Sequence, residues 1–375
     1  MSVLLAAALA AMMAASFARS GRLSPAEPQI EANEGFRQLW LGDSGAAVRH
    51  FETALKADPV FPYRWSDLGD ALVIAGETGR ARQYFNRALE LAPHDPQIAL
   101  RAANFHFRAG EPDQAMKLDS GVLRQVPDYD DTVFSSCLRM GGDLNRVLDV
   151  AIGDNRRAAL AFFRFLAGQG DRGALNTAWK WLETRGFVDR ALAVSRTSAL
   201  LGQNRPEEAI AVWRKYVSPL RDSLNTVENP GFERPSENEG FDWRVAPVSG
   251  ATVSEDSAVA HGGRRSLKIA FDAADNLDFH HVWQPVWLGP GRYRLTAWIR
   301  TENLSTDQGI GLRIDGAATE AFTGTHDWTQ VTTDFTVAGK PALEKLEIVR
   351  HPSLKFDSKP RGTVWVDDVE LRPAP

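Results

Sequence analysis

The first half of this chain repeats itself with a step of 34 residues. A shift of 34 residues places Gly42-Asp43-Ser44-Gly45 on Gly76-Glu77-Thr78-Gly79, and that stretch on Gly110-Glu111-Pro112-Asp113. A fixed period of this length is typical of solenoids, in which each short unit buries its apolar face only against its neighbours. The flanking positions keep the same step: Ala47, Ala81 and Ala115; Phe51 and Phe85; Pro59, Pro93 and Pro127.

The repeated positions carry the residue types that a helix–turn–helix unit needs. The small residue Gly69 lets two helices approach closely, and Phe85 fills the layer between neighbouring units. Pro93 ends the second helix because proline cannot continue it. Gly76 and Gly79 are expected to form the sharp turn between the helices. The sequence therefore predicts consecutive pairs of helices.

In period and residue pattern this region resembles the tetratricopeptide repeat family. Three copies are clear, and Cys137 falls at the small packing position of a fourth, degenerate unit, where a buried structural thiol is expected. Residues 155–217 continue with amphipathic helical patterning, in which Ala209 and Trp213 repeat the spacing of a small residue and an aromatic one. We therefore expect a helical repeat domain over residues 28–217.

Gly42-Asp43-Ser44-Gly45 also matches the string around the nucleophile of trypsin-like serine proteases. Such a serine needs a histidine base, an orienting carboxylate and oxyanion donors. Ser44, however, aligns with Thr78 and Pro112, and proline cannot be a nucleophile. The repeat therefore predicts a structural role for Ser44, in the turn between two helices.

The family resemblance implies that the first helix of each pair lines a groove that holds a peptide or another protein. The Lys/Asn set with which chaperone-binding relatives clamp a terminal carboxylate is absent except for Asn104. A solvated wall is the alternative for each candidate. The candidate groove residues are Phe36, Trp40, Asp70, Asn104 and Arg108.

The chain begins with an apolar stretch over residues 1–18 that ends in Ser16-Phe17-Ala18, a small-x-small pattern like that of a signal-peptide cleavage site. No Lys or Arg precedes the stretch, and Arg19 follows it directly. The sequence predicts a periplasmic or extracellular protein. The alternatives are an uncleaved membrane tether through residues 3–18 and a mis-assigned start.

Helical patterning stops near residue 218, and a linker over residues 218–224 is expected to separate two domains. Residues 225–375 contain short segments that alternate apolar and polar residues between Gly, Pro, Asn or Asp, which predicts an antiparallel β-sandwich or jelly roll. These segments are SLKIAF (266–271), HVWQPVWL (281–288), RYRLTAWIR (292–300), GIGLRID (309–315), WTQVTTDFTV (328–337), LEKLEIVR (343–350) and TVWVDDVEL (363–371).

Six phrases in order resemble the jelly-roll carbohydrate-binding modules of the family 4/9 type, across nearly all of residues 225–375. The resemblance implies a sandwich that binds glycans without cleaving them. The phrases are Asn229-Pro230-Gly231-Phe232-Glu233, Trp243, His261-Gly262-Gly263 with Arg265-Ser266-Leu267-Lys268-Ile269, Gln284 with Leu288-Gly289-Pro290-Gly291-Arg292-Tyr293, Trp328, and Val366-Asp367-Asp368-Val369-Glu370-Leu371.

The candidate sugar-binding residues are Trp283, Trp298, Arg300 and Arg313. Sugars pack their C–H faces on indole rings, while arginine pairs with hydroxyl groups. Alternation along residues 292–300 places Trp298 and Arg300 on one face of their strand, and we expect Arg313 and Trp283 to join them there. The alternative is that these side chains pack beneath a loop or against the helical domain.

The same resemblance implies a structural calcium ion that ties the first strand of the sandwich to the last. Glu233 and Asp368 match the positions that commonly supply its carboxylates. Calcium favours six to eight oxygen ligands, so backbone carbonyls and water would complete its shell. The alternative is that both residues are solvated acids at strand ends.

Charge and cysteine content exclude other classes of function. The net charge is −5 and neither half has the basic excess that phosphate binding requires, so nucleic acid is not expected as a partner. The single cysteine rules out an intramolecular disulfide and a cysteine-based zinc site. The eight histidines lack ligand spacing, and the two predicted domains leave no room for a catalytic one.

The sequence thus predicts a multidomain α plus β protein, with a tetratricopeptide solenoid followed by a β-sandwich. Its predicted function is that of a non-enzymatic, exported adaptor. The repeats dock a protein partner, and the jelly roll binds a glycan or cell-envelope polysaccharide beside polysaccharide assembly or export. The alternative is a pure protein-interaction scaffold whose sandwich does not bind sugar.

Overall fold

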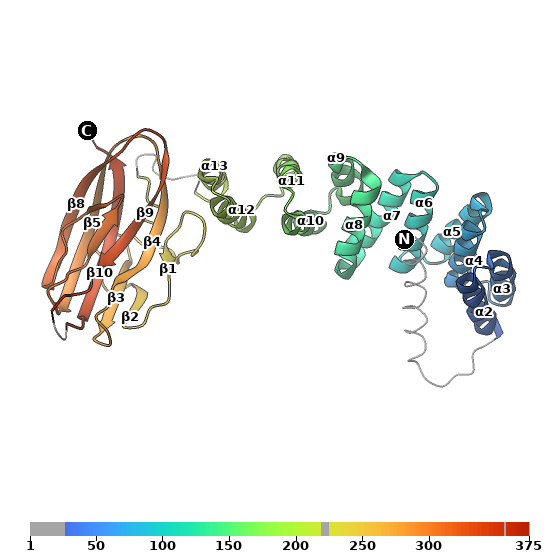
Figure 1. Ribbon diagram of the computed structural model, residues 1–375, viewed down its shortest axis with the longest axis horizontal. Coiled ribbons are helices and arrows are strands. Elements are labelled where there is room, and N and C mark those ends of the chain that lie inside the picture. The colour runs from blue at the N-terminus through green and yellow to red at the C-terminus, as the bar shows by residue number, and fades with distance from the viewer. Residues whose placement is uncertain (1–26, 219–224, 356–357, 375) are drawn as a thin grey trace. The chain divides into compact units, whose positions relative to one another are not determined.

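The computed structural model describes residues 27–218, 225–355 and 358–374 (Figure 1). The chain divides into two compact units, Met1–Phe187 (unit 1) and Val188–Pro375 (unit 2). The predicted signal peptide or tether and most of the predicted linker lie outside the described residues. The boundary at residues 187/188 places the last helix pair in the unit of the sandwich, whereas the hydrophobic period of the sequence changes only near residue 218.

Unit 1 consists of α-helices that pack mostly as successive pairs, as Figure 1 shows from α2 onward. This arrangement confirms the predicted solenoid of helical hairpins. The helices are α2 (Glu27–Leu41), α3 (Ser44–Ala57), α4 (Pro62–Ile74), α5 (Thr78–Leu91), α6 (Pro96–Arg108), α7 (Pro112–Gln125), α8 (Asp130–Gly141), α9 (Leu144–Val147), α10 (Arg156–Gln169) and α11 (Arg172–Thr184), with a 3-10 turn η1 (Pro127–Tyr129) and a π-helical turn η2 (Leu148–Ile152).

Close helix packing explains the repeated glycines. A Cβ atom on Gly69 of α4 would lie 3.0 Å from the Phe85 ring of α5, so only glycine fits there without a shift of its neighbour. Gly76 has a φ of +84°, which favours glycine at the turn. Gly79, predicted to share that turn, instead lies in the first turn of α5. Ser44 was also expected in a turn, but it is the first residue of α3, behind the N-cap residue Asp43.

The helix start accounts for both differences. The first residues of a helix have free N–H groups and accept Ser, Thr or Pro, so the repeat keeps Ser44, Thr78 and Pro112 at one helical position. The side chain of Asp43 accepts a hydrogen bond from the backbone N–H of Ala46 at 2.8 Å, as an N-cap does. The protease-like string is therefore a helix cap.

The described residues of unit 2 form two helices and two five-stranded antiparallel sheets (Figure 1). Sheet A has the strand order β1-β4-β9-β6-β7, and sheet B has the order β2-β3-β10-β5-β8. The elements are α12 (Arg190–Gly202), α13 (Pro206–Tyr216), β1 (Arg244–Val245), β2 (Ala251–Asp256), β3 (Ser266–Asp272), β4 (Phe279–Leu288), β5 (Gly291–Leu304), β6 (Gly311–Ile314), β7 (Ala317–Ala318), β8 (Gly324–Val337), β9 (Ala342–Arg350) and β10 (Arg361–Pro373).

The two sheets of unit 2 enclose one apolar core, which confirms the predicted β-sandwich. The longer strands contribute alternate residues to it, such as Leu346 and Ile348 of β9 or Val364 and Val366 of β10, all fully buried. The intervening residues face outward from the sandwich. Among the described residues, no helix has both the length and the apolar character that a membrane span requires.

Candidate functional site

The outer face of sheet A carries an aromatic residue between charged ones. The strand register pairs Arg244 of β1 with Trp283 of β4, Trp283 with Glu347 of β9, and Glu347 with Arg313 of β6. Lys345 lies two residues before Glu347 and therefore faces the same side of β9. We call these five residues, Arg244, Trp283, Arg313, Lys345 and Glu347, the sheet A row. They span four neighbouring strands and lie on a rigid framework.

Ion pairs fix the geometry of the sheet A row. One carboxylate, that of Glu347, binds Arg313 at 2.6 Å and Lys345 at 2.5 Å. Burial acts to raise the pKa of Glu347, but its hydrogen bonds to Lys345 and Arg313 outweigh burial and hold the pKa below its usual value. Glu347 is therefore ionised at neutral pH and anchors both cations.

The Trp283 ring lies beneath two cations. The ammonium of Lys345 is 5.0 Å from the ring centroid, and the guanidinium carbon of Arg244 is 5.7 Å from it. These are the distances of cation–π contacts. The sheet A row can therefore offer an indole edge together with several hydrogen-bond donors, which is the chemistry that recognises polar ring-shaped ligands.

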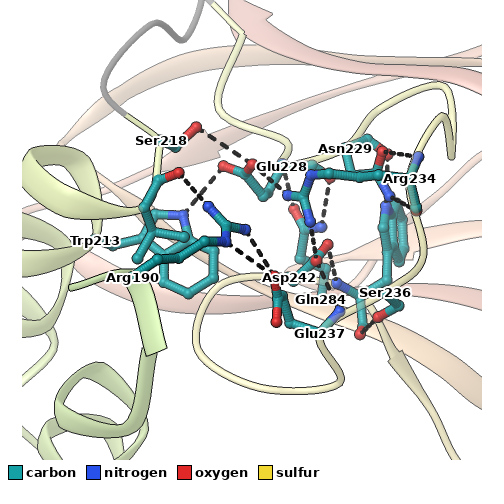
Figure 2. Close-up of polar contacts among 12 residues, drawn as sticks. Arg190, Trp213, Ser218, Glu228, Asn229, Arg234, Ser236, Glu237, Asp242 and Gln284 are labelled. Carbon is teal, nitrogen blue, oxygen red and sulfur yellow. Dashed lines mark hydrogen bonds and ion pairs between the residues drawn. The ribbon is translucent and has the colours of Figure 1, made fainter. Parts of the chain in front are cut away.

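A buried polar network holds the two strands that bear Arg244 and Trp283 (Figure 2). The fully buried side chain of Gln284, next to Trp283 on β4, accepts a hydrogen bond from the backbone N–H of Glu228 and donates one to its carbonyl, both at 2.8 Å. This gives Gln284 a structural role: its side chain ties the backbone at Glu228, at the start of the sandwich, to β4.

The network continues through charges to the start of β1 (Figure 2). Arg234 donates to Glu228 at 2.6 Å and to Asp242 at 2.7 Å. Burial acts to lower the pKa of Arg234, but the two carboxylates raise it above its usual value. Asp242 also accepts from the backbone N–H of Trp243 at 2.9 Å. Because Arg244 follows directly, this network fixes the first residue of the sheet A row.

The helix pair α12–α13 is part of the same network. The indole N–H of Trp213 donates to Glu228 at 3.1 Å, and Arg190 donates to Glu237 at 2.7 Å (Figure 2). Trp213 is fully buried in an apolar cluster with Phe241, and Trp287 of β4 packs against that cluster. Trp287 therefore packs with the helix pair, whereas the sheet A row crosses β4 at Trp283, earlier in the same strand.

The structure does not bring the four predicted sugar-binding residues together, which corrects that expectation. Trp283 and Arg313 lie on sheet A, whereas Trp298 and Arg300 lie on β5 of sheet B. Alternation shows which residues of one strand share a face, but it does not show which of the two sheets the strand joins. The sequence predicted correctly that Trp298 and Arg300 share one face of β5. It predicted wrongly that Trp283 and Arg313 join them on the same face of the sandwich.

On sheet B the predicted side chains are covered by neighbours. The ring of His261 stacks on Trp298 with 3.9 Å between centroids, and Trp328 lies edge-on to the same histidine. Arg300 lies over the ring of Trp365 at 5.6 Å. One face of the Trp298 ring is therefore covered by His261, and the Arg300 guanidinium is engaged in a cation–π contact with Trp365.

Glu233 and Asp368, the predicted calcium ligands, both contact the loop at residues 261–265. Glu233 accepts hydrogen bonds from the backbone N–H groups of Arg264 and Arg265, and Asp368 binds the imidazole of His261 at 2.7 Å. The described part of the chain contains no group of three or more His, Cys, Asp or Glu side chains arranged for a metal ion. These residues do not form a metal cage as they stand, and the calcium site stays a prediction.

The predicted groove residues lie on the first helices of three pairs, α2, α4 and α6, but their surroundings differ. Phe36 packs edge-on against Phe51 at 5.0 Å and is partly buried against the helix core. Trp40 is 78% exposed. Asp70 is held by an ion pair with Arg101 at 2.6 Å.

Asn104 and Arg108 are exposed on α6, and their side chains make no hydrogen bond or ion pair with another described residue. Four further exposed apolar side chains lie on these first helices: Ile30 and Leu41 of α2, Ile74 of α4 and Phe107 of α6.

Sequence reasoning missed three members of the sheet A row: Arg244, Lys345 and Glu347. Alternation in LEKLEIVR places Lys345 and Glu347 on one face, so a signal for those two existed. Arg244 lies in a strand of only two residues, which gives no alternation to read.

Comparisons with known proteins identify the repeats of unit 1. Residues 38–96 and 72–133 each match tetratricopeptide repeat family models. These stretches run from α2 to α8 and confirm the repeat type expected from the period. Among curated proteins, none matches the chain significantly.

Solved structures match parts of the chain at low identity. MamA of Desulfovibrio magneticus matches with 14% identity and a TM-score of 0.31, over 44% of this chain and 97% of that one. The type III secretion translocator chaperone SycD of Yersinia enterocolitica matches with 16% identity and a TM-score of 0.28, over 32% and 96%. The CBM22-1 xylan-binding domain of Paenibacillus barcinonensis Xyn10C matches with 12% identity and a TM-score of 0.27, over 38% and 90%. None of these scores is high enough to transfer a function.

Proposed function

We propose that the protein is a non-enzymatic adaptor that works outside the cytoplasm, beside polysaccharide assembly or export. The repeats of unit 1 hold a protein partner, and the sandwich of unit 2 binds a glycan or cell-envelope polysaccharide through the sheet A row. The observation that carries the proposal is the placement of Trp283 among fixed donors on an outward face of the sandwich.

Glycan binding follows from the chemistry of the sheet A row. An indole packs against the C–H face or edge of a sugar ring, and charged side chains hydrogen-bond with its hydroxyl groups. Arg313 and Lys345 are held in place by Glu347, so little side-chain entropy is lost when a ligand arrives. The resemblance of residues 225–375 to carbohydrate-binding modules points to the same ligand class.

The test is a glycan-array screen of the full chain, followed by titration of the strongest ligand. Trp283→Ala should weaken binding by roughly tenfold or more, which corresponds to one lost contact between the indole and a sugar ring. Trp298→Ala is the matched control, because it removes an outward-facing tryptophan from the opposite sheet. Binding that depends on Trp298 and not on Trp283 contradicts the assignment, and the absence of any bound glycan favours the pure scaffold.

A protein partner is supported by the tetratricopeptide repeats, which hold peptides and proteins in other chains. It is also supported by exposed apolar side chains at corresponding positions of α2 and α4, Trp40 at 78% and Ile74 at 51% exposure. The double variant Trp40→Ser, Ile74→Ser should lose a partner that co-purifies with the native protein. Val60→Ser, at an equally exposed valine between helices, should retain it.

Export is tested on native material. Mass spectrometry should find a mature N-terminus near Arg19 in an extracytoplasmic fraction. An intact start at Met1 or Ser2 in soluble cytoplasmic protein would contradict this part of the proposal.

A further inference from the structure

We propose that the glycan bound at the sheet A row is acidic, a polysaccharide whose sugars carry carboxylates. The inference rests on the proposed function and adds the chemical class of the ligand. The row contains three cationic side chains, Arg244, Arg313 and Lys345, and one carboxylate, Glu347.

The single carboxylate of the row is turned away from solvent. The Glu347 side chain is 8% exposed, whereas those of Lys345 and Arg313 are 47% and 37% exposed. The buried acid therefore positions the two cations, and the cations face the solvent. A ligand that approaches this face meets positive charge first.

Arg244 adds a cation that no carboxylate neutralises by direct contact within the described chain. Its terminal nitrogens donate to the backbone carbonyls of Asn238 and Gly240, and its Nε is buried without a hydrogen-bond partner. Two acids lie near it, and both are engaged elsewhere. Asp242 is buried against Arg234, and Glu239 accepts from Ser198.

The cations also decide between neutral and acidic sugars. A neutral sugar needs a bare indole face, but Lys345 and Arg244 both lie over the Trp283 ring, at 5.0 and 5.7 Å. A sugar carboxylate forms charge-assisted hydrogen bonds with those cations while the sugar ring borders the indole. Arginine in particular matches the planar geometry of a carboxylate. The same contacts that obstruct neutral stacking therefore favour an anionic ligand.

The experiment titrates the full chain with polygalacturonate, alginate and hyaluronate, each beside its carboxyl-esterified form, and with neutral xylan and dextran sulfate. At least one acidic polymer should bind about tenfold or more tightly than its ester, and the difference should shrink as salt is added. Lys345→Gln should weaken that binding by about tenfold, the value of one charge-assisted contact. Lys268→Gln is the matched control, because Lys268 lies over Trp365 on sheet B at 5.7 Å and should leave the affinity unchanged.

The outcomes separate this inference from the proposed function. Binding of xylan or of the esters at the strength of the acids overturns the acidic-ligand inference and leaves glycan binding intact. Binding of dextran sulfate that survives Trp283→Ala is ion exchange by the surface and also overturns the inference. Failure of every glycan, acidic and neutral, overturns the proposed function itself.

Discussion

Asp119 in unit 1 makes a quantitative prediction about pH. Asp119 is 1% exposed, and the Cys137 thiol donates to its carboxyl group at a distance of 3.5 Å. Burial raises the pKa of Asp119 to about 7, against a contribution from the Cys137 hydrogen bond that lowers it. An aspartate in the unfolded chain has a pKa near 3.8. The folded protein therefore binds this proton more tightly than the unfolded chain does.

The sign of the pH dependence follows from that difference. Well below pH 3.8 the group is protonated in both states, and its full contribution to stability is present. As the pH rises from about 4 to about 7, the unfolded chain ionises while the folded protein keeps the proton, and above about 7 the folded protein must bury a charge, so unit 1 loses stability over this range. About three pKa units correspond to a loss of about 4 kcal/mol in the free energy of unfolding.

The assay uses the only cysteine of the chain, Cys137, which is buried in unit 1. The protein is equilibrated in a urea series at each pH, and a brief pulse of a disulfide reagent that still labels exposed thiols quickly at acidic pH reports the unfolded fraction. Asp119→Asn removes the titrating group. Its stability relative to the native protein should rise by about 4 kcal/mol between pH 4 and pH 8. A difference that does not change with pH would refute the reasoning, whatever its size.

Three further predictions concern packing and the ion. Trp213→Ala should destabilise unit 2 by about 3–5 kcal/mol in chemical denaturation, because it empties a fully buried site and frees Glu228 of a donor; a cost below 1 kcal/mol would mean that the helix pair is not tied to the sandwich. Gly69→Val should destabilise unit 1 by about 1–3 kcal/mol in chemical denaturation, because its side chain would press on Phe85. Gly79→Ala, which has open space around it, should be neutral or stabilising in the same measurement. Calcium should raise the melting midpoint of unit 2, and Asp368→Asn should abolish the rise; equal midpoints with calcium and with chelator would remove the ion.

The solenoid was readable from the sequence because the same physical constraint recurs at every step. Gly69 must be small where Phe85 packs, and Gly35 is small for the same reason at Phe51. Repetition turns these local constraints into a period that can be recognised without any alignment. Gly79 shows the limit of this reasoning, because a glycine near a turn can also belong to the first turn of the next helix.

The sequence did not show what packs against the last helix pair, α12–α13. The spacing of Ala209 and Trp213 predicts an amphipathic helix with one buried face, and both residues are buried. The pattern does not say what covers that face. In the structure it is covered partly by Phe241, from the loop before β1, so that α13 belongs to the unit of the sandwich.

Two tryptophans on opposite faces of the sandwich show why the sheet A row needed the structure. Trp283 and Trp365 each lie beneath one lysine and one arginine at similar distances. Composition and alternation treat them alike. Trp365 is 5% exposed and donates its indole N–H to Asp256, so its cations complete a closed cluster. Trp283 is partly exposed, and Lys345 over its ring forms an ion pair with the buried carboxylate of Glu347. The sheet that a strand joins, and the side chain opposite it, therefore decide which cation-covered indole can receive a ligand.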